Sequence, residues 1–298
     1  MRLRAATRGS ELALWQTHRI SELLASALPG VEVEPVVVST EGDRDQSSPI
    51  AAIGGRGVFA KEVQRAVLDG RADFAVHSAK DLTSTTPDGL VLGAIPERGA
   101  VEDGLVGSTL DGLGEGATVA TGSVRRRAQL AHLRPDLHFV ELRGNMATRL
   151  SRLDGDDVDA IVVAAAGLQR LGLGDRIDEI LDPSTMLPQV AQGALAVECR
   201  DGDSATIDAL AAIDDARLAE VVEVERAWLR RLGSGCDLPV GGLATRVGDA
   251  IRLEVVLSDH AGTTLIRHEE SDPDPVAVVE RVADEVLDRR GGRELLDR

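Results

Sequence analysis

The most constraining feature of this sequence is an alternation of short apolar runs with longer amphipathic ones, which occurs twice in the first two-thirds of the chain. The first round predicts strands at 3–7, 31–38, 73–76 and 90–95, with helices at 10–28 and 58–68. The second predicts strands at 118–120, 137–140 and a buried, parallel-type one at 160–163, with helices at 124–133 and 146–153. Because strands that alternate with helices form helix-covered sheets, the pattern predicts two α/β lobes.

The last third has another pattern. A long amphipathic helix is predicted over 214–232, followed by strand-like runs at 238–247, 251–258 and 263–269 and a closing helix at 276–289. Gly248 and Gly262 fall in the turns between the runs, and Gly233 is placed to end the long helix in the left-handed conformation. We therefore expect a C-terminal α+β domain with a three-stranded antiparallel sheet.

Composition limits the partners. The chain has 298 residues, enough for two or three domains, and a net charge of −17. Its only lysines are Lys61 and Lys80, so 31 of the 33 basic residues (33 − 2) are arginines. An acidic surface with few aromatic side chains argues against nucleic acid as a partner. No run is apolar enough for a membrane span or a signal peptide, so we expect a cytoplasmic protein.

The acid excess also indicates a halophile-like acidic surface. In molar salt the Debye length is only about 3 Å, so a local cluster of arginines would decide the binding of an anion. The alternative is a GC-rich genome that prefers arginine codons. It explains the shortage of lysine but not the excess of acidic residues.

Cys236 is one of two cysteines and lies in the segment LGSGCDLPVGG, after Gly233 and Gly235. Glycine neighbours leave the sulfur uncrowded, which suits a point of covalent attachment. The alternative is a small buried side chain, which is the usual fate of a free cysteine. For Cys199, which follows an apolar run, we expect core packing. The histidines show no metal-ligand spacing, so no metal is expected.

Asp81 lies in HSAKDL, directly after the strand predicted at 73–76. The carboxyl ends of strands in α/β lobes face the ligand crevice. A carboxylate there, beside Lys80, could bind a cationic or N–H-bearing substrate and could shuttle a proton. A helix N-cap or a surface ion pair is an equally good interpretation of the pattern.

Several arginines adjoin predicted strand-to-helix junctions. They are Arg8, which precedes Ser10, then Arg125 and Arg126, Arg143 and Arg149. Helix N-termini and arginine forks both suit anions. Successive helical residues point about 100° apart, so Arg127 should point to solvent. For any one arginine a solvated face is the ordinary interpretation, but four such junctions predict an anion-lined cleft and a ligand with several carboxylates.

Eight segments resemble the porphobilinogen deaminase (hydroxymethylbilane synthase) family, in family order. They are ATRGSELALWQ (6–16), GRGVFAKE (55–62), ADFAVHSAKDL (72–82), TGSVRRRAQL (121–130), LRGNMATRL (142–150), AAGLQRLGL (165–173), QVAQGALAVECR (189–200) and ERAWLRRLGSGCDLP (225–239). The resemblance implies three domains. The first two, 1–96 with 191–213 and 97–190, would be like type-two periplasmic binding proteins with the active cleft between them. The third, 214–298, would carry the cofactor.

The resemblance also implies the chemistry. Cys236 would hold a dipyrromethane cofactor through a thioether, and Asp81 would be the catalytic group. Four porphobilinogen molecules would condense on this primer with loss of ammonia, and hydrolysis would release hydroxymethylbilane for tetrapyrrole biosynthesis. The cofactor would be bound by Ser10, Lys80, Thr121, Ser123, Arg125, Arg126 and Gln192. The substrate would be bound by Arg8, Arg143 and Arg149, and the protein would be a monomer.

The sequence departs from the family pattern at several positions. Arg56 replaces a lysine, Ala79 a methionine, Ser234 a glycine, and Gly104 an alanine after Asp103. These changes put rate or specificity in doubt, but not the identities of the cofactor-attachment and catalytic residues. The polar segment 39–56 is expected to be a mobile loop or lid.

Two other functions compete with this one. The first is a two-lobed anion-binding module without catalysis, which leaves Cys236 without a role. The second is a cysteine-nucleophile enzyme, which needs a histidine base near the thiol. His77 is the only histidine near the predicted cleft, and we expect it to lie beside the strand and not beside a candidate thiol.

Overall fold

The computed structural model describes residues 1–40, 60–233 and 238–296. Backbone contacts group the chain into two compact units, one of residues 1–99 with 193–220 and one of residues 100–192 with 221–298. The first unit has nearly the bounds predicted for the first domain. The second unit contains the stretches predicted as second and third domains, and their separation stays a prediction.

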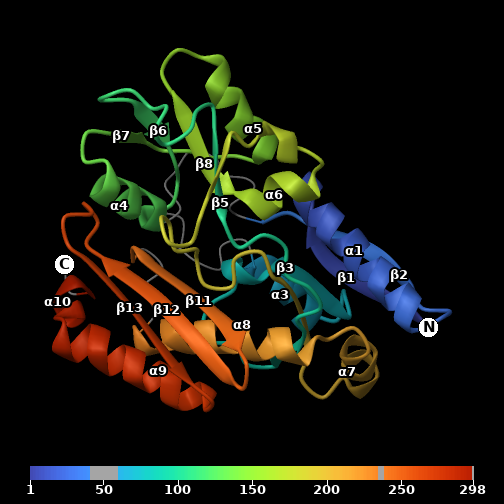
Figure 1. Ribbon diagram of the computed structural model, residues 1–298. Helices are drawn as coiled ribbons and strands as arrows, with labels where there is room; N and C mark the ends of the chain where they lie inside the picture. The colour runs from blue at the N-terminus through green and yellow to red at the C-terminus, as the bar shows by residue number, and fades with distance from the viewer. Residues whose placement is uncertain (41–59, 234–237, 297–298) are drawn as a thin grey trace. The chain divides into compact units, whose positions relative to one another are not determined.

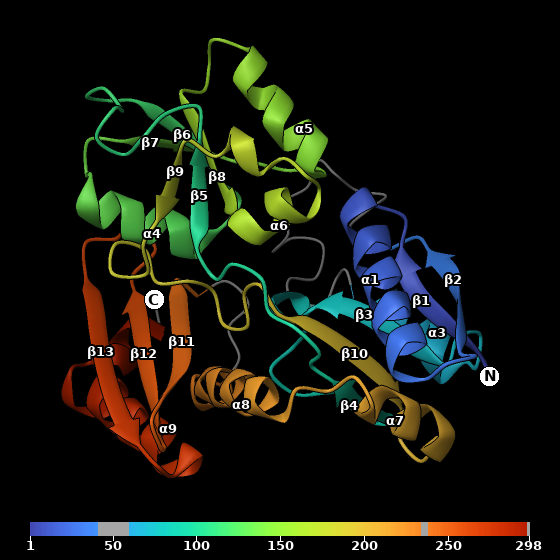
Figure 2. The same ribbon diagram turned by 45° about the vertical axis from the view of Figure 1, so that its right-hand side comes forward.

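The first unit, hereafter the first lobe, contains a five-stranded sheet in the order β2-β1-β3-β10-β4 (Figures 1 and 2). Its strands are β1 (Arg2–Arg8), β2 (Glu32–Val38), β3 (Phe74–Ser78), β4 (Leu90–Ala94) and β10 (Leu195–Arg200). Its helices are α1 (Glu11–Ala27), α3 (Lys61–Leu68) and α7 (Ser204–Ala211). Strand β1 is parallel to β2 and β3, whereas β10 is antiparallel to both of its neighbours.

Alternation along the strands places helices on both faces of this sheet. Phe74 packs with Ile20 and Leu24 of α1, while the next residue, Ala75, packs with Val63 of α3. Successive strand side chains point to opposite faces, so each face has its own apolar core.

The second lobe, which lies within the second unit, repeats this topology in the order β7-β6-β8-β5-β9 (Figure 2). Its strands are β5 (Asp103–Val106), β6 (Thr118–Ala120), β7 (His138–Val140), β8 (Ala160–Ala164) and β9 (Glu179–Leu181). Its helices are α4 (Val124–Leu133), α5 (Met146–Leu150) and α6 (Ala165–Arg170). Strand β6 is parallel to β7 and β8, and β5 is the antiparallel strand.

The C-terminal part of the second unit is a three-stranded antiparallel sheet of β11 (Val240–Val247), β12 (Ala250–Ser258) and β13 (Leu265–Asp272). Helix α8 (Ala216–Arg231) precedes it, and α9 (Pro275–Ala283) and α10 (Gly292–Leu296) follow it. Gly248 and Gly262 have φ of +62° and +75°, as the turns between strands require. Gly233 has φ +71° just after α8, which confirms the predicted left-handed helix end.

The predicted fold class is confirmed: there are two α/β lobes and a C-terminal α+β region with an antiparallel sheet. The alternation did not reveal that each lobe holds one antiparallel strand. The strand predicted at 160–163 as parallel-type is parallel to β6 but antiparallel to β5. Strands β5 and β9 and helices α6 and α7 were also not predicted. The predicted loop 39–56 falls almost wholly outside the described residues.

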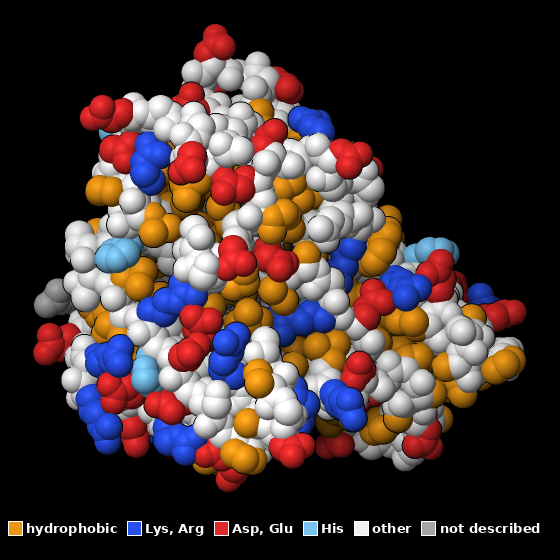
Figure 3. Space-filling view, viewed as in Figure 1, with side chains coloured by type: hydrophobic (Ala, Val, Ile, Leu, Met, Phe, Trp, Pro, Cys, Tyr) orange, Lys and Arg blue, Asp and Glu red, His pale blue; other side chains and the backbone are white. Residues whose placement is uncertain are grey.

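Charged side chains of both signs are interspersed over the face drawn in Figure 3. Within the described ranges, none of the helices is both long enough and apolar enough to cross a membrane.

Candidate functional site

The first lobe has a pocket at the ends of β1 and β3. Its polar lining includes Arg8, Ser10, Gln16, Ser78 and Asp81. Ser10 is the N-cap of α1, and its Oγ accepts a hydrogen bond from the backbone N of Ala13 at 3.4 Å. Two residues predicted to bind ligand, Arg8 and Ser10, therefore share a pocket with the predicted catalytic carboxylate.

Asp81 reaches this pocket because β3 ends in a single 3₁₀ turn, Ala79–Asp81. It closes the turn and is partly exposed, so it is not a helix N-cap. Lys80 is also partly exposed but is not part of the pocket lining. On another wall, Gln16 Nε2 donates to Ser78 Oγ at 2.7 Å, which fixes α1 against the end of β3.

The sequence did not indicate what His77 contacts, and the structure places it beside Glu198. Its Nε2 lies 3.1 Å from Glu198 Oε2, and both side chains are buried. Gln64 Nε2 also donates to Glu198 Oε2 at 2.8 Å. The two side chains meet because β10 pairs antiparallel with β3, which was not predicted. Ala196 lies opposite His77, and Glu198, two residues further along β10, points to the same face of the sheet. His77 also lines the pocket that contains Asp81.

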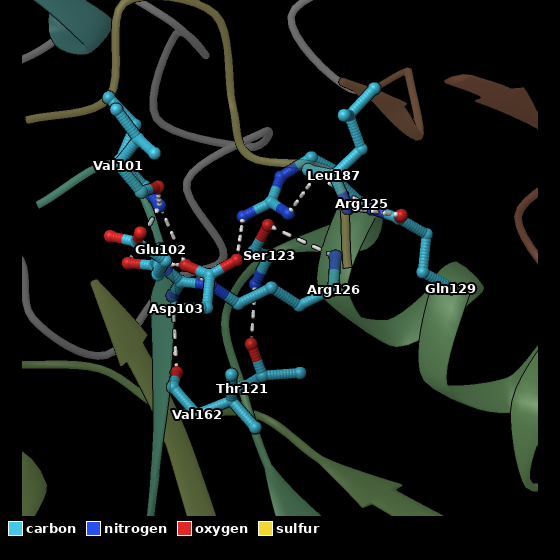
Figure 4. A network of polar contacts seen from close by, with 11 residues as sticks. Val101, Glu102, Asp103, Thr121, Ser123, Arg125, Arg126, Gln129, Val162 and Leu187 are labelled. Carbon is cyan, nitrogen blue, oxygen red and sulfur yellow. Dashed lines mark hydrogen bonds and ion pairs between the residues drawn. The ribbon is translucent and has the colours of Figure 1, made fainter. Parts of the chain in front are cut away.

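In the second lobe, two predicted cofactor ligands converge on one buried carboxylate (Figure 4). Arg125 Nη2 donates to Asp103 Oδ2 at 2.6 Å, and Arg126 Nε donates to Asp103 Oδ1 at 2.9 Å. Asp103 is fully buried, and the side chains of Arg125 and Arg126 are only 3% and 7% exposed. Burial opposes ionisation of Asp103, but the two guanidinium groups outweigh it and hold its pKa well below the ordinary value.

The remaining contacts of the two arginines are mostly with backbone carbonyls. Arg125 Nη1 donates to Leu187 O at 2.6 Å, and Arg126 Nη1 donates to Val162 O at 3.1 Å. One nitrogen of the pair makes no such contact: Arg125 Nε is buried and has no hydrogen-bond partner among the described residues. Burial, together with the charge of Arg126, lowers the pKa of Arg125. Arg127, the next residue on α4, is exposed as predicted.

Thr121 and Ser123 shape the start of α4. Ser123 is its N-cap and accepts from the backbone N of Arg126 at 3.4 Å. Thr121 Oγ1 accepts from the backbone N of Ser123 at 3.3 Å. These hydroxyls hold the turn that carries the arginine pair, as Ser10 does at the start of α1.

Gln192 contacts the arginine cluster through Asp103. Its Nε2 donates to Asp103 Oδ1 at 2.9 Å and to Val101 O at 2.8 Å. The preceding residue, Ala191, has φ +60°, which is unfavourable for a residue with a side chain. Glu225 of α8 stabilises this conformation, because its Oε2 accepts from the backbone N of Ala191 at 2.6 Å. Its Oε1 accepts from the backbone N of Ala244 at 2.9 Å.

Arg143 and Arg149 flank the start of α5. Asn145 is the N-cap and accepts from the backbone N of Thr148 at 3.0 Å. Arg149 Nε donates to Gly144 O at 3.0 Å. Burial raises the pKa of the nearby Glu141, and the charges of Arg143 and Arg149 only partly offset this.

The predicted attachment residue Cys236 lies outside the described residues, as do the departures at Arg56 and Ser234. Cys199 is a fully buried part of the β10 core, as predicted, and burial raises its pKa to about 11. Such a thiol is a packing group and not a nucleophile.

Comparison with known proteins assigns the family. Residues 3–208 match the profile described as "Porphobilinogen deaminase, dipyromethane cofactor binding domain", and residues 219–288 match "Porphobilinogen deaminase, C-terminal domain". The chain belongs to the porphobilinogen deaminase family. Both arginine-bearing lobes thus fall within the cofactor-binding region of that family.

Curated porphobilinogen deaminases match over nearly the whole chain. The protein of Maridesulfovibrio salexigens is 44% identical, covering 98% of this chain and 96% of its own. That of Roseiflexus sp. is 45% identical, covering 97% of each. That of Syntrophotalea carbinolica is 44% identical, covering 94% of this chain and 89% of its own.

Among solved structures, the methionine-binding protein MetQ covers 74% of this chain at 12% identity, with 92% of its own length matched and a TM-score of 0.46. A score this low does not support the fold, which rests on the three sheets described above.

Sequence reasoning missed three buried acids, Asp103, Glu198 and Glu225, all of which organise the site. Asp103 was noted only as a family position. The available signal was a carboxylate within or directly before a short apolar run, as in LAVECR and DGLV, because buried acids need partners.

Proposed function

We propose that the chain is a transferase that condenses four porphobilinogen molecules, with loss of ammonia, on a dipyrromethane primer and releases hydroxymethylbilane by hydrolysis. The observation that carries this is the buried Nε of Arg125, which has no hydrogen-bond partner among the described residues although it lies in the region matching the cofactor-binding domain. A pyrrole chain bearing acetate and propionate groups supplies the acceptor that such a donor lacks.

The residues present fit such a cofactor. We assign its thioether attachment to Cys236, and the binding of its carboxylates to Ser10, Lys80, Thr121, Ser123, Arg125 and Arg126. Gln192 is fully buried, and its amide donates to Asp103 and Val101, so we assign it to supporting this cluster. When bound, the dipyrromethane supplies the pyrrole carbon to which the first substrate is joined.

Asp81 is the residue we assign to catalysis. It lines the pocket with Arg8, which would bind a substrate carboxylate, as would Arg143 and Arg149. The carboxylate of Asp81 can accept a hydrogen bond from a pyrrole N–H and stabilise the cation left when the C–N bond of the substrate's protonated aminomethyl group (–CH2–NH3⁺) breaks and ammonia departs with the electron pair. It can then take up the proton released when the new C–C bond forms.

An anion-binding module without catalysis is the alternative. It explains the arginines equally well, but it gives no role to a carboxylate in the pocket or to Cys236. We also propose that the protein is a cytoplasmic monomer, that it does not bind nucleic acid and that its acidic surface is adapted to salt. Turnover that holds or rises in molar salt supports the last proposal, and loss of turnover there rejects it.

The mass of the intact chain tests the function. Protein purified from cells that make the cofactor should carry the mass of two linked pyrroles, and Cys236→Ser should lose it. Cys199→Ser is the matched control, because that thiol lies in the core and should leave the adduct in place. Wild-type protein of unmodified mass, or an adduct that persists in Cys236→Ser, would reject the proposal.

A further inference from the structure

Both oxygens of Asp103 have donors from the protein itself. Oδ1 accepts from Arg126 Nε at 2.9 Å and from Gln192 Nε2 at 2.9 Å, and it also lies 2.8 Å from Arg126 Nη2. Oδ2 accepts from Arg125 Nη2 at 2.6 Å. The protein thus makes three contacts with Oδ1 and one with Oδ2, and these contacts hold the fully buried carboxylate in place.

The charge of the cluster shows why such a carboxylate is needed. Arg125 and Arg126 are consecutive on α4 and both buried, so without a counter-ion they would place two like charges in a region with little water. Asp103 reduces the sum from +2 to +1. Since each of its oxygens contacts a different guanidinium group, it also fixes the direction of each group.

We infer that Asp103 is a positioning residue for the arginine pair: it orients Arg125 and Arg126 and leaves Nε of Arg125 as the donor for one carboxylate of the dipyrromethane. This inference rests on the proposed function. Asp103 itself does not touch the ligand, since its oxygens already have protein donors.

The test compares Asp103→Asn and Asp103→Glu with wild-type protein, all purified from cells that make the cofactor. Asp136→Asn is the matched control, because Asp136 also pairs with an arginine of the second lobe, Arg134, but in a partly exposed position. The first readout is the fraction of protein that carries the adduct, from the intact mass. The second is the KM for porphobilinogen, set against kcat, for the loaded fraction.

We expect the adduct-bearing fraction to fall at least about tenfold in Asp103→Asn and to recover in part in Asp103→Glu, which keeps the charge. Asp136→Asn should load fully. For the loaded fraction, kcat should fall more than KM rises, because a misplaced primer reacts poorly in spite of bound substrate. Full loading of a folded Asp103→Asn with unchanged kcat would overturn the inference.

A second variant keeps the test decisive if Asp103→Asn does not fold. Asp103→Asn combined with Arg126→Gln restores the sum of +1 and should fold, yet it should remain poorly loaded because the one remaining guanidinium group, that of Arg125, has lost its anchor. Full loading of the double variant would show that Asp103 only balances charge and would overturn the positioning role. If wild-type protein itself lacks the adduct, the proposed function fails, and that outcome is distinct from a failure of this inference.

Discussion

The two lobes have the same strand order but place different chemistry on it. In each lobe the helix that follows the second strand of the sheet, β1 or β6, begins with a serine N-cap, Ser10 in one and Ser123 in the other. In each lobe the antiparallel strand carries a buried acid, Glu198 or Asp103. The partners of that acid differ. Glu198 contacts the neutral Gln64 and a histidine, whereas Asp103 contacts two arginines.

The strands that follow also differ. After β3 the first lobe has a polar 3₁₀ turn that ends in Asp81, while after β8 the second lobe continues directly into the apolar start of α6. The first lobe therefore offers a partly exposed carboxylate in a pocket, and the second offers buried, preorganised positive charge. We therefore propose that one topology carries a proton-transfer site in the first lobe and an anion site in the second, because function depends on the residues at strand ends and not on the fold.

Replacing Asp81 should have the largest effect. Asp81→Ala should reduce kcat at least 10²-fold to about 10⁴-fold, since it removes the only acid–base group we assign to the pocket. Its stability should change by less than about 1 kcal/mol, because the side chain is partly exposed. Turnover assays and thermal unfolding of the same preparations measure the two effects.

The control for this variant is Asp88→Asn, which changes an exposed acid of the same lobe and should leave turnover unchanged. A loaded Asp81→Ala enzyme with wild-type kcat would mean that the two lobes do not divide the chemistry as we propose.

Arginine substitutions should separate the lobes by stability. Arg126→Met should lower the free energy of unfolding by about 3–5 kcal/mol, since it breaks the buried ion pair with Asp103. Arg8→Met, at the partly exposed pocket of the first lobe, should cost less than about 1 kcal/mol and instead raise the KM for porphobilinogen. Urea unfolding with steady-state kinetics measures both, and equal losses of stability would contradict the contrast.

The sequence predicts most of the helices and strands of the two lobes and several of the residues that follow the strands. Helix α4 has the predicted bounds, and Asp81 and the arginines were found because they follow strands whose apolar periods are visible. Strands β5 and β9 were not predicted, although β6 and β7 are as short and were, because no helical run next to them marks a βαβ alternation.

The pairing of Asp103 with Arg125 was equally hidden from the sequence. The two residues are 22 positions apart, and they meet only because β5 inserts beside β8 in the sheet. The partner of His77 was missed for the same reason, since β10 joins the first sheet from more than a hundred residues away. Local patterns predict which residues lie at strand ends, whereas sheet order decides which buried charges meet.

Replacing the buried acid of each lobe by its amide should cost different amounts. Glu198→Gln should lower the free energy of unfolding by about 1–3 kcal/mol, because a glutamine oxygen can still accept from Gln64. Asp103→Asn should cost about 3–5 kcal/mol, because it leaves two buried arginines without a counter-ion. Denaturant titrations of the two variants decide the matter, and a larger loss in Glu198→Gln would reverse our interpretation of the lobes.

The smallest effect we expect is that the loss of stability in Asp103→Asn depends on pH. Although burial alone would raise the pKa of Asp103, Arg125 and Arg126 hold it well below the ordinary value, which is about 3.9 in an unfolded chain. Because the pKa is lower in the folded state, the carboxylate stabilises the fold fully at any pH above the unfolded-state pKa. This contribution is lost as the pH falls from there through the folded-state pKa. The difference in Tm between wild-type protein and Asp103→Asn should therefore be constant from about pH 8 to pH 5 and shrink below about pH 4.

The control is Asp88→Asn, which changes an exposed acid and should show no such pH-dependent difference in Tm. A difference for Asp103→Asn that widens in acid would mean that Asp103 is not held ionised by its arginines, and the electrostatic contrast between the lobes would fail with it.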